Sequence, residues 1–192
     1  MKHLFALSLW FLSVAFLPGQ EFKLGGKAGE FTIRDVKGNA VQFSALKGDV
    51  TVITFIAAKC PISNDYNGRM TALYNDYAPK GVKFVFINSN NTEPAAEVEA
   101  HARQNGFPFQ VYKDDNNLVA DRFGAQVTPE SFVLEKAGVM RYHGSIDDSQ
   151  VLARVQVQRL RKALDSVLAG QPVETSQTKA FGCTIKRVRK AA

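Results

Sequence analysis

The sequence predicts an α/β sandwich with a central sheet of mixed strand directions and a β-hairpin at its start. Three observations support this fold class. Short, nearly continuous apolar runs rich in β-branched and aromatic residues indicate strands buried on both faces. Segments with apolar residues at helical spacing alternate with these runs. Gly, Pro, Asn and Asp separate the two kinds of segment, so the chain is expected to place helices on both faces of one sheet.

The hairpin is predicted in FTIRDVKGNAVQFSAL, residues 31–46. Apolar residues alternate with polar ones on both sides of Lys37-Gly38-Asn39, as two strands joined by a tight turn require. The next run, TVITFIAA at 51–58, has the continuous apolar character of a central strand.

A cysteine separates that central strand from a predicted helix. The helix is expected to run from Pro61 to about Tyr77, because apolar residues recur there at helical spacing before Pro79 and Gly81 end the pattern. Cys60 therefore stands where a strand leads into a helix.

The alternation of strands and helices continues to residue 170. Predicted strands are apolar and rich in β-branched or aromatic residues, and the longer predicted helices end at glycine. Asp147 and Asp148 are expected to help cap the last helix. The predicted elements are a strand at 82–89, a helix at 93–106, a strand at 107–114, a short helix at 116–125, two strands within 131–146, and a helix at 151–170.

The first twenty residues have the character of a secretory signal. A basic start precedes an apolar run at 4–17, which Pro18 and Gly19 end, and this run is short for a membrane span. We expect residues 1–20 to be a signal peptide, with a membrane anchor as the alternative. Either segment would place the rest of the chain outside the cytoplasm, periplasmic or secreted, where disulfides persist.

The remaining chain divides into a domain at 21–170 and a basic tail at 171–192 that carries Cys183. Hydrophobic residues make up 45% of the chain and charged residues 22%, which argues against disorder and against a multi-span membrane protein. The net charge is +6, but the tail offers neither a set of aromatic platforms nor a nucleic-acid-binding motif. We expect no nucleic-acid partner and at most weak association with a membrane surface.

Cys60 has the sequence context of a reactive thiol. Chemistry in α/β folds gathers beyond the carboxyl ends of the strands, and a helix N-terminus there favours thiolate over thiol. Pro61 costs no hydrogen bond at the first helical position. Lys59 adds a neighbouring positive charge, and the Ser63 hydroxyl could support the thiolate from one turn further on.

Several motifs resemble one superfamily. They are FxxxxCPxS ending at Ser63, GVKFVFINSN, GAQVTPESFVLE with Thr128-Pro129, YHGSIDD, and AFGCTIKR in the tail. From about Glu30 to Gly170 the chain resembles the thioredoxin-like superfamily, in particular bacterial secreted proteins of the redoxin or alkyl hydroperoxide reductase and thiol-specific antioxidant (AhpC/TSA) type. The resemblance implies a three-layer sandwich in which Pro129 is cis and packs against Cys60, leaving the Thr128 backbone open to pair with a bound substrate segment.

The same resemblance implies redox chemistry at Cys60. A thiol-disulfide oxidoreductase would act on protein thiols or disulfides, or on small thiols, and would need an extracytoplasmic electron donor. The second cysteine of the usual pair is replaced by Ser63, and the hydroxyl residue that precedes a peroxidatic cysteine is replaced by Ala57. Thiol peroxidase activity is the alternative within this class, and the absence of a hydroxyl at position 57 argues against it.

Cys183 could supply the missing partner. If the tail folds back over the helix that begins after Cys60, Cys183 could act as a resolving thiol. The same bond could instead be a permanent staple of a non-catalytic binding module, and Cys60 could also be an inert buried residue. These three readings stay open from the sequence.

Other polar residues are weaker candidates. Asn88, Ser89, Asn90 and Asn91 follow a buried strand and could line the site or simply form a turn. The possible soft or imidazole metal ligands after the predicted signal are the two cysteines, His101 and His143. Arg141 is expected on the same face of a predicted strand as His143. We expect no cofactor and no metal site, with a copper-binding metallochaperone as a minor alternative.

Overall fold

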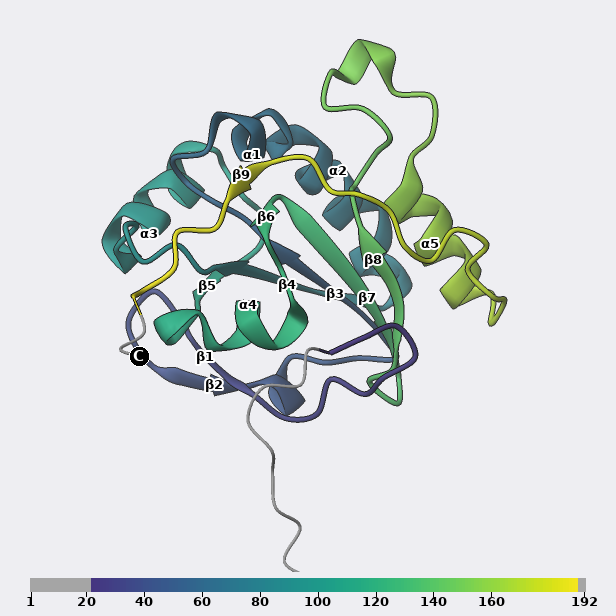
Figure 1. The fold of residues 1–192 in the computed structure, drawn as a ribbon, viewed down its shortest axis with the longest axis horizontal. Coiled ribbons are helices and arrows are strands. Elements are labelled where there is room, and N and C mark those ends of the chain that lie inside the picture. The colour runs from purple at the N-terminus through teal and green to yellow at the C-terminus, as the bar shows by residue number, and fades with distance from the viewer. Residues whose placement is uncertain (1–21, 190–192) are drawn as a thin grey trace, which may run out of the picture.

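The computed structural model describes residues 22–189, so the predicted signal or anchor at 1–20 lies outside the described residues. Their central sheet has the strand order β2-β1-β5-β4-β3-β7-β8 (Figure 1). A second, two-stranded sheet joins β6 to β9. The strands are β1 Thr32–Arg34, β2 Ala40–Gln42, β3 Val50–Phe55, β4 Val82–Asn88, β5 Val111–Lys113, β6 Val127–Thr128, β7 Glu130–Glu135, β8 Met140–Gly144 and β9 Cys183–Thr184.

The strand directions confirm the predicted mixed sheet. β3, β4 and β5 are parallel, whereas β7 is antiparallel to β3 and β8 is antiparallel to β7. The predicted hairpin is also present, because β1 and β2 pair antiparallel. β1 also pairs antiparallel with β5, which joins the hairpin to the rest of the sheet. The helices are α1 Pro61–Asp65, α2 Asn67–Tyr77, α3 Ala95–Gln104, α4 Leu118–Phe123 and α5 Arg159–Leu168.

Two hydrophobic cores cover the two faces of the sheet. Alternate residues of β3 face opposite ways, so Val50 and Val52 pack with α2, α3 and α5, while Ile53 and Phe55 pack with α4 and the N-terminal segment. Burying each such side chain contributes about 1.5–3 kcal/mol to the free energy of unfolding. None of the helices in residues 22–189 is both long enough and apolar enough to cross a membrane.

The single helix predicted from Pro61 to Tyr77 is divided in two at Tyr66. The backbone of Tyr66 has φ −94° and ψ −3°, and its side chain is buried with its hydroxyl donating to the Ser149 carbonyl at 3.2 Å. Because of this break, the short helix α1 places its N-terminus at Cys60, while the separate helix α2 packs on the sheet. Apolar spacing could not reveal it, because the core residues keep helical spacing on both sides.

The prediction of a helix at 151–170 is wrong for the first half of that range. α5 begins only at Arg159, and the preceding residues form a projecting loop with a 3₁₀ turn at Leu152–Arg154 (Figure 1). The Asp148 carboxylate accepts from the Gln156 N–H at 3.0 Å and closes this loop, so Asp148 does not cap α5. Asp147 pairs with Arg69 at 3.0 Å instead.

The predicted strand at 107–114 is also shorter, because only Val111–Lys113 pairs with a neighbour. The tail returns from α5 across one end of the sheet and runs along β6 to α1 before it turns down beside β5 (yellow in Figure 1). Hydrogen bonds of the His143 main chain with Ser176 and Thr178 fasten the first part of this path.

Candidate active site

Cys60 occupies the N-cap of α1, immediately beyond the central strand β3. Its backbone is extended, Pro61 stands at the start of the helix, and the Ser63 N–H donates to the Cys60 Sγ at 3.3 Å. Only 5% of Cys60 is exposed. The sulfur is therefore buried at a helix N-terminus, where backbone N–H groups favour a negative charge.

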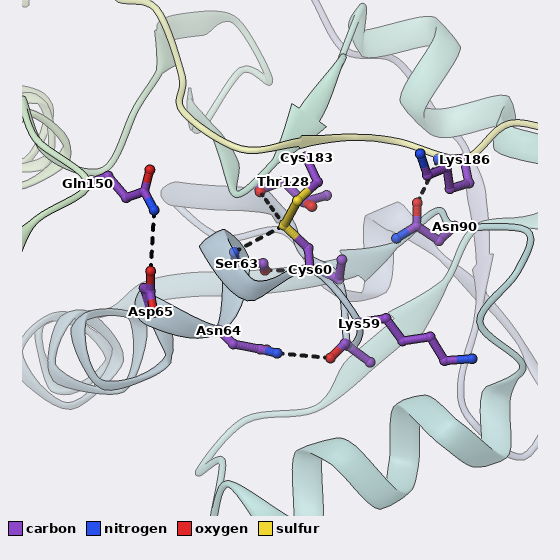
Figure 2. Close-up of a disulfide and its surroundings, with 12 residues drawn as sticks. Lys59, Cys60, Ser63, Asn64, Asp65, Asn90, Thr128, Gln150, Cys183 and Lys186 are labelled. Atoms are coloured by element: carbon purple, nitrogen blue, oxygen red, sulfur yellow. Dashed lines mark hydrogen bonds between the residues drawn. A yellow bond between two sulfur atoms is a disulfide. The ribbon is translucent and has the colours of Figure 1, made fainter.

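A disulfide joins Cys60 to Cys183, 123 residues further along the chain (Figure 2). The Cα–Cα distance of 6.0 Å lies in the normal range for a disulfide. Neither of the two cysteines of the chain is free. The tail therefore folds back over the start of the cysteine helix, which is the condition under which Cys183 could act as a resolving thiol.

The Thr128–Pro129 peptide bond is cis, as the motif resemblance predicts. The Thr128 carbonyl oxygen lies 3.6 Å from the Cys60 Sγ. The Thr128 backbone is not open, however, because β9 pairs with it antiparallel and sets Cys183 opposite Thr128. Thus the tail occupies the edge that was expected to accept a substrate segment.

Gly182 shows how closely the tail fits this edge. A Cβ atom at Gly182 would overlap the carbonyl group of Thr128. Glycine at this position lets the tail backbone approach close enough to pair with β6 and to bring Cys183 to Cys60.

Beyond Cys183, the described tail is fixed mainly through its backbone. The Ile185 N–H donates to the Gln126 carbonyl at 3.0 Å, and the Ile185 side chain is buried in the core on the α4 side. Lys186 donates its N–H to the Asn90 Oδ1 at 2.7 Å and accepts at its carbonyl from the Asn91 N–H at 2.9 Å.

Two further contacts hold the end of the described tail. The Arg187 guanidinium pairs with Asp121 at 2.7 Å and also donates to the Ala125 carbonyl. The Val188 N–H donates to the Asn117 Oδ1 at 2.8 Å. Cys183 is thus held beside Cys60 by non-covalent contacts as well as by the disulfide.

Ser63 and Lys59 act differently from the sequence expectation. The Ser63 hydroxyl accepts from the Ala57 N–H at 3.1 Å, so the Ser63 backbone, not its hydroxyl, contacts the sulfur. The Lys59 Nζ pairs with Glu97 at 2.5 Å and its side chain points away from the disulfide (Figure 2).

Glu93 is a site residue that sequence reasoning missed. Its carboxylate is buried and accepts from the Ala58 N–H at 2.8 Å and from the Lys59 N–H at 3.0 Å, so it fixes the loop directly before Cys60. Amide groups of Asn88 and Asn90 donate to the same carboxylate at 2.5 and 3.1 Å. The polar run that ends in Glu93 was a detectable signal, but the backbone groups of Ala58 and Lys59 that it binds are distant in sequence.

The polar residues at 88–91, which the sequence suggested could line the site, instead hold Glu93 and the tail in place. Asn88, Ser89 and Asn90 are buried, while Asn91 is exposed and binds the tail through its N–H. The Lys113 ammonium lies inside this cluster and donates to the Asn88 Oδ1 at 2.6 Å. Burial lowers the pKa of Lys113, and nearby Glu93 partly opposes that change.

The two histidines belong to separate contacts. His143 binds the buried carboxylate of Glu130 at 2.6 Å, and Glu130 also accepts from the backbone N–H groups of Gln126 and Val127 just before the cis bond. His101 binds the Asn64 Oδ1 at 2.8 Å, and burial lowers the pKa of His101.

Arg141 does not join His143 in a common site, because Arg141 pairs with Glu135 at 3.3 Å. Within the described part of the chain, no three His, Cys, Asp or Glu side chains are grouped so that they could hold a metal ion.

Comparison with known proteins gives this geometry a family context. Residues 24–143 match the AhpC/TSA family model. The thiol-disulfide oxidoreductase ResA of Halalkalibacterium halodurans is 25% identical over 139 residues, which cover 72% of this chain and 78% of ResA.

One of the similar solved structures covers more of the chain than the family model does. The crystal structure of an uncharacterized conserved protein from Geobacillus kaustophilus superimposes with a TM-score of 0.82 at 34% identity, covering 92% of this chain and 100% of that one. The thioredoxin domain of a thiol-disulfide oxidoreductase from Bacteroides vulgatus gives a TM-score of 0.54 at 17% identity, with 62% and 86% covered. At that identity the likeness shows the thioredoxin-like fold alone.

Proposed function

Since the chain belongs to the AhpC/TSA family, we propose that it is an extracytoplasmic thiol-disulfide oxidoreductase whose redox pair is Cys60 and Cys183. The observation that carries this proposal is the position of their disulfide, at the N-terminus of α1 and against the cis-proline loop. A helix N-terminus stabilises the thiolate that disulfide exchange requires.

The proposed reaction starts from the reduced pair. The Cys60 thiolate attacks one sulfur of a substrate disulfide, and the other substrate sulfur leaves as a thiolate that takes up a proton. The Cys183 thiolate then attacks the Cys60 sulfur, releases the second substrate thiolate and forms the Cys60–Cys183 bond. Two electrons pass from the protein to the substrate, and an external thiol must return them.

The tail supports this role for Cys183 because contacts other than the disulfide also fasten it to the domain. Hydrogen bonds to Gln126, Asn90 and Asn117 hold the backbone on the far side of Cys183. A resolving thiol that stays close to its target reacts at a high effective concentration. The separation of 123 residues in sequence is therefore no obstacle to rapid closure.

Protein disulfides with an extended backbone are the proposed substrates. The β6 edge that β9 occupies would accept such a segment once the tail yields, because both would use the same backbone pairing at Thr128. The Thr128 hydroxyl is buried and has no hydrogen-bond partner within residues 22–189. It could therefore form a hydrogen bond with a polar group of a bound substrate.

The extracytoplasmic location rests on the apolar segment in residues 1–20 and on the disulfide itself, since disulfides persist in oxidising compartments. A cleaved signal and a retained membrane anchor remain alternatives for that segment. The electron donor is expected to be a thiol of the same compartment.

The competing function is a non-catalytic binding module in which the Cys60–Cys183 disulfide is permanent and structural. Both functions contain the same bond, so they differ in whether that bond exchanges. Thiol peroxidase activity has less support, because Ala57 places no hydroxyl before Cys60 and its N–H is bound to Ser63.

Cys60→Ser should abolish the acceleration by this protein of insulin reduction by dithiothreitol, leaving only the uncatalysed rate, because no nucleophile remains at the helix N-terminus. Cys183→Ser should still form the first mixed disulfide and should accumulate it, since the resolving thiol is missing. Turbidity follows the insulin reaction, and intact mass detects the trapped species. Full activity in the Cys60→Ser protein would refute the proposal.

A further inference from the structure

The two cysteines of the disulfide differ in their exposure to solvent. Cys60 is 5% exposed and lies beneath the tail, whereas Cys183 is partly exposed on the tail itself. Figure 2 shows Cys60 on the helix side of the bond and Cys183 on the strand that crosses above it. The neighbours of Cys183 do little to cover it, because Gly182 has no side chain and Thr184 is small and exposed.

The two sulfur atoms also differ as leaving groups. A thiolate leaving from Cys60 would keep the Ser63 N–H at 3.3 Å and the N-terminus of α1 beside it. β9 is only two residues long, so Cys183 has no helix terminus of its own to stabilise a negative charge. Disulfide exchange is faster when the leaving thiolate is the more stabilised one and when the attacked sulfur is the more accessible one.

We infer that an external reducing thiol attacks Cys183, not Cys60, when the oxidised protein is recharged; this inference rests on the proposed oxidoreductase function. In that step the thiolate of the reductant bonds to the Cys183 sulfur, the Cys60–Cys183 bond breaks, and Cys60 leaves as the thiolate. A second thiol of the reductant then attacks the reductant sulfur of the mixed disulfide. That step releases Cys183 as a thiolate and the reductant departs as a disulfide, so the two electrons that the reductant has lost reside on the reduced Cys60 and Cys183.

This assignment divides the work between the two cysteines. Electrons enter at Cys183, on the outer strand, and leave from Cys60, at the helix. The reductant touches the tail first, so the β6 edge need not be vacated during recharging. The chemical class of the reductant is a thiol with a second thiol within reach, or two molecules of a monothiol.

The experiment uses the oxidised full chain and reduced glutathione. Samples are quenched with acid at a series of short times, free thiols are alkylated, and peptide mass spectrometry locates the glutathione adduct. Extrapolation to zero time removes later transfer between the two cysteines. We expect adduct on Cys183 to exceed adduct on Cys60 by at least about tenfold, with Cys60 recovered in the alkylated form.

The control is the same oxidised chain in concentrated urea, where burial and the helix N-terminus are lost and the two adducts should approach equal amounts. Initial adduct mainly on Cys60 in the folded protein would overturn the inference, while insulin reduction and its loss in Cys60→Ser would still support the proposed function. A folded disulfide that forms no adduct at all, although the unfolded one does, would contradict both.

Discussion

The chemistry of Cys60 depends on three neighbours that fix the sulfur and the loop before it. The Ser63 N–H contacts the sulfur, the Thr128 carbonyl lies 3.6 Å from it, and Glu93 holds the backbone of the two preceding residues. The sequence predicts Cys60, Ser63 and Thr128 because they belong to local motifs. It does not predict Glu93, whose contacts cross 34 and 35 residues.

Glu93→Gln should lower the free energy of unfolding by about 1–3 kcal/mol, because hydrogen bonds to a buried charged group are lost or weakened. Urea denaturation of the oxidised protein measures this change. Glu97→Gln is the matched control, since Glu97 forms an exposed ion pair with Lys59 and its loss should cost less than about 1 kcal/mol. Equal effects of the two substitutions would contradict the supporting role of Glu93.

We expect the contact of His101 in α3 with Asn64 in α1 to depend on pH. Burial lowers its pKa below the ordinary value of 6.5, so the unfolded chain binds a proton at a pH where the folded chain does not. Stability contributed by neutral His101 is therefore present above about pH 6.5 and is lost as the pH falls toward the folded pKa.

Comparison with His101→Gln isolates this effect, because the carboxylates titrate in both proteins. Between pH 7 and pH 5 the wild type should lose more of its free energy of unfolding than the variant, as measured by urea denaturation at each pH. The same pH slope in both proteins would exclude His101 as the cause.

Among the elements, the two-stranded sheet of β6 and β9 holds Cys183 next to Cys60, although each strand has only two residues. Apolar periodicity predicted the hairpin and the central strands, because those elements bury a continuous face. It could not predict β6 or β9, whose pairing depends on the close approach at Gly182 and on contacts far along the chain. Nor could it predict that Val151 and Leu152 are exposed on a loop instead of lying on a helix.

Arg187→Ala should make the disulfide easier to reduce, because it removes the contacts with Asp121 and the Ala125 carbonyl and so lowers the effective concentration of Cys183 at Cys60. A tenfold decrease would raise the reduction potential by about 30 mV. Equilibration with glutathione buffers measures this shift.

Lys186→Ala is the control for that substitution, since the hydrogen bonds of Lys186 to Asn90 and Asn91 use only its main chain. Its reduction potential should stay close to that of the wild type. An unchanged potential in Arg187→Ala would show that this anchor does not position the resolving cysteine.

At the scale of the whole molecule, the disulfide ties the tail to the start of α1, beyond the carboxyl end of β3, and closes a loop that spans most of the described chain. On the chain-entropy estimate such a closure stabilises the fold by about 5 kcal/mol. The order of strands and helices predicted the sandwich and the location of Cys60 at its edge. The sequence left the partner of Cys60 open, because the path of the tail is set by scattered polar contacts with no periodic pattern.

The same closure is compatible with a permanent staple and with a reversible redox pair, so the exchange behaviour of the bond decides between them. The most direct test is a redox titration of the purified protein in thiol buffers of defined potential, with free thiols trapped by alkylation and counted by intact mass. The proposed function predicts reversible reduction of Cys60 and Cys183 together at a potential above about −300 mV. A bond that stays oxidised below that potential would contradict it and identify the disulfide as structural.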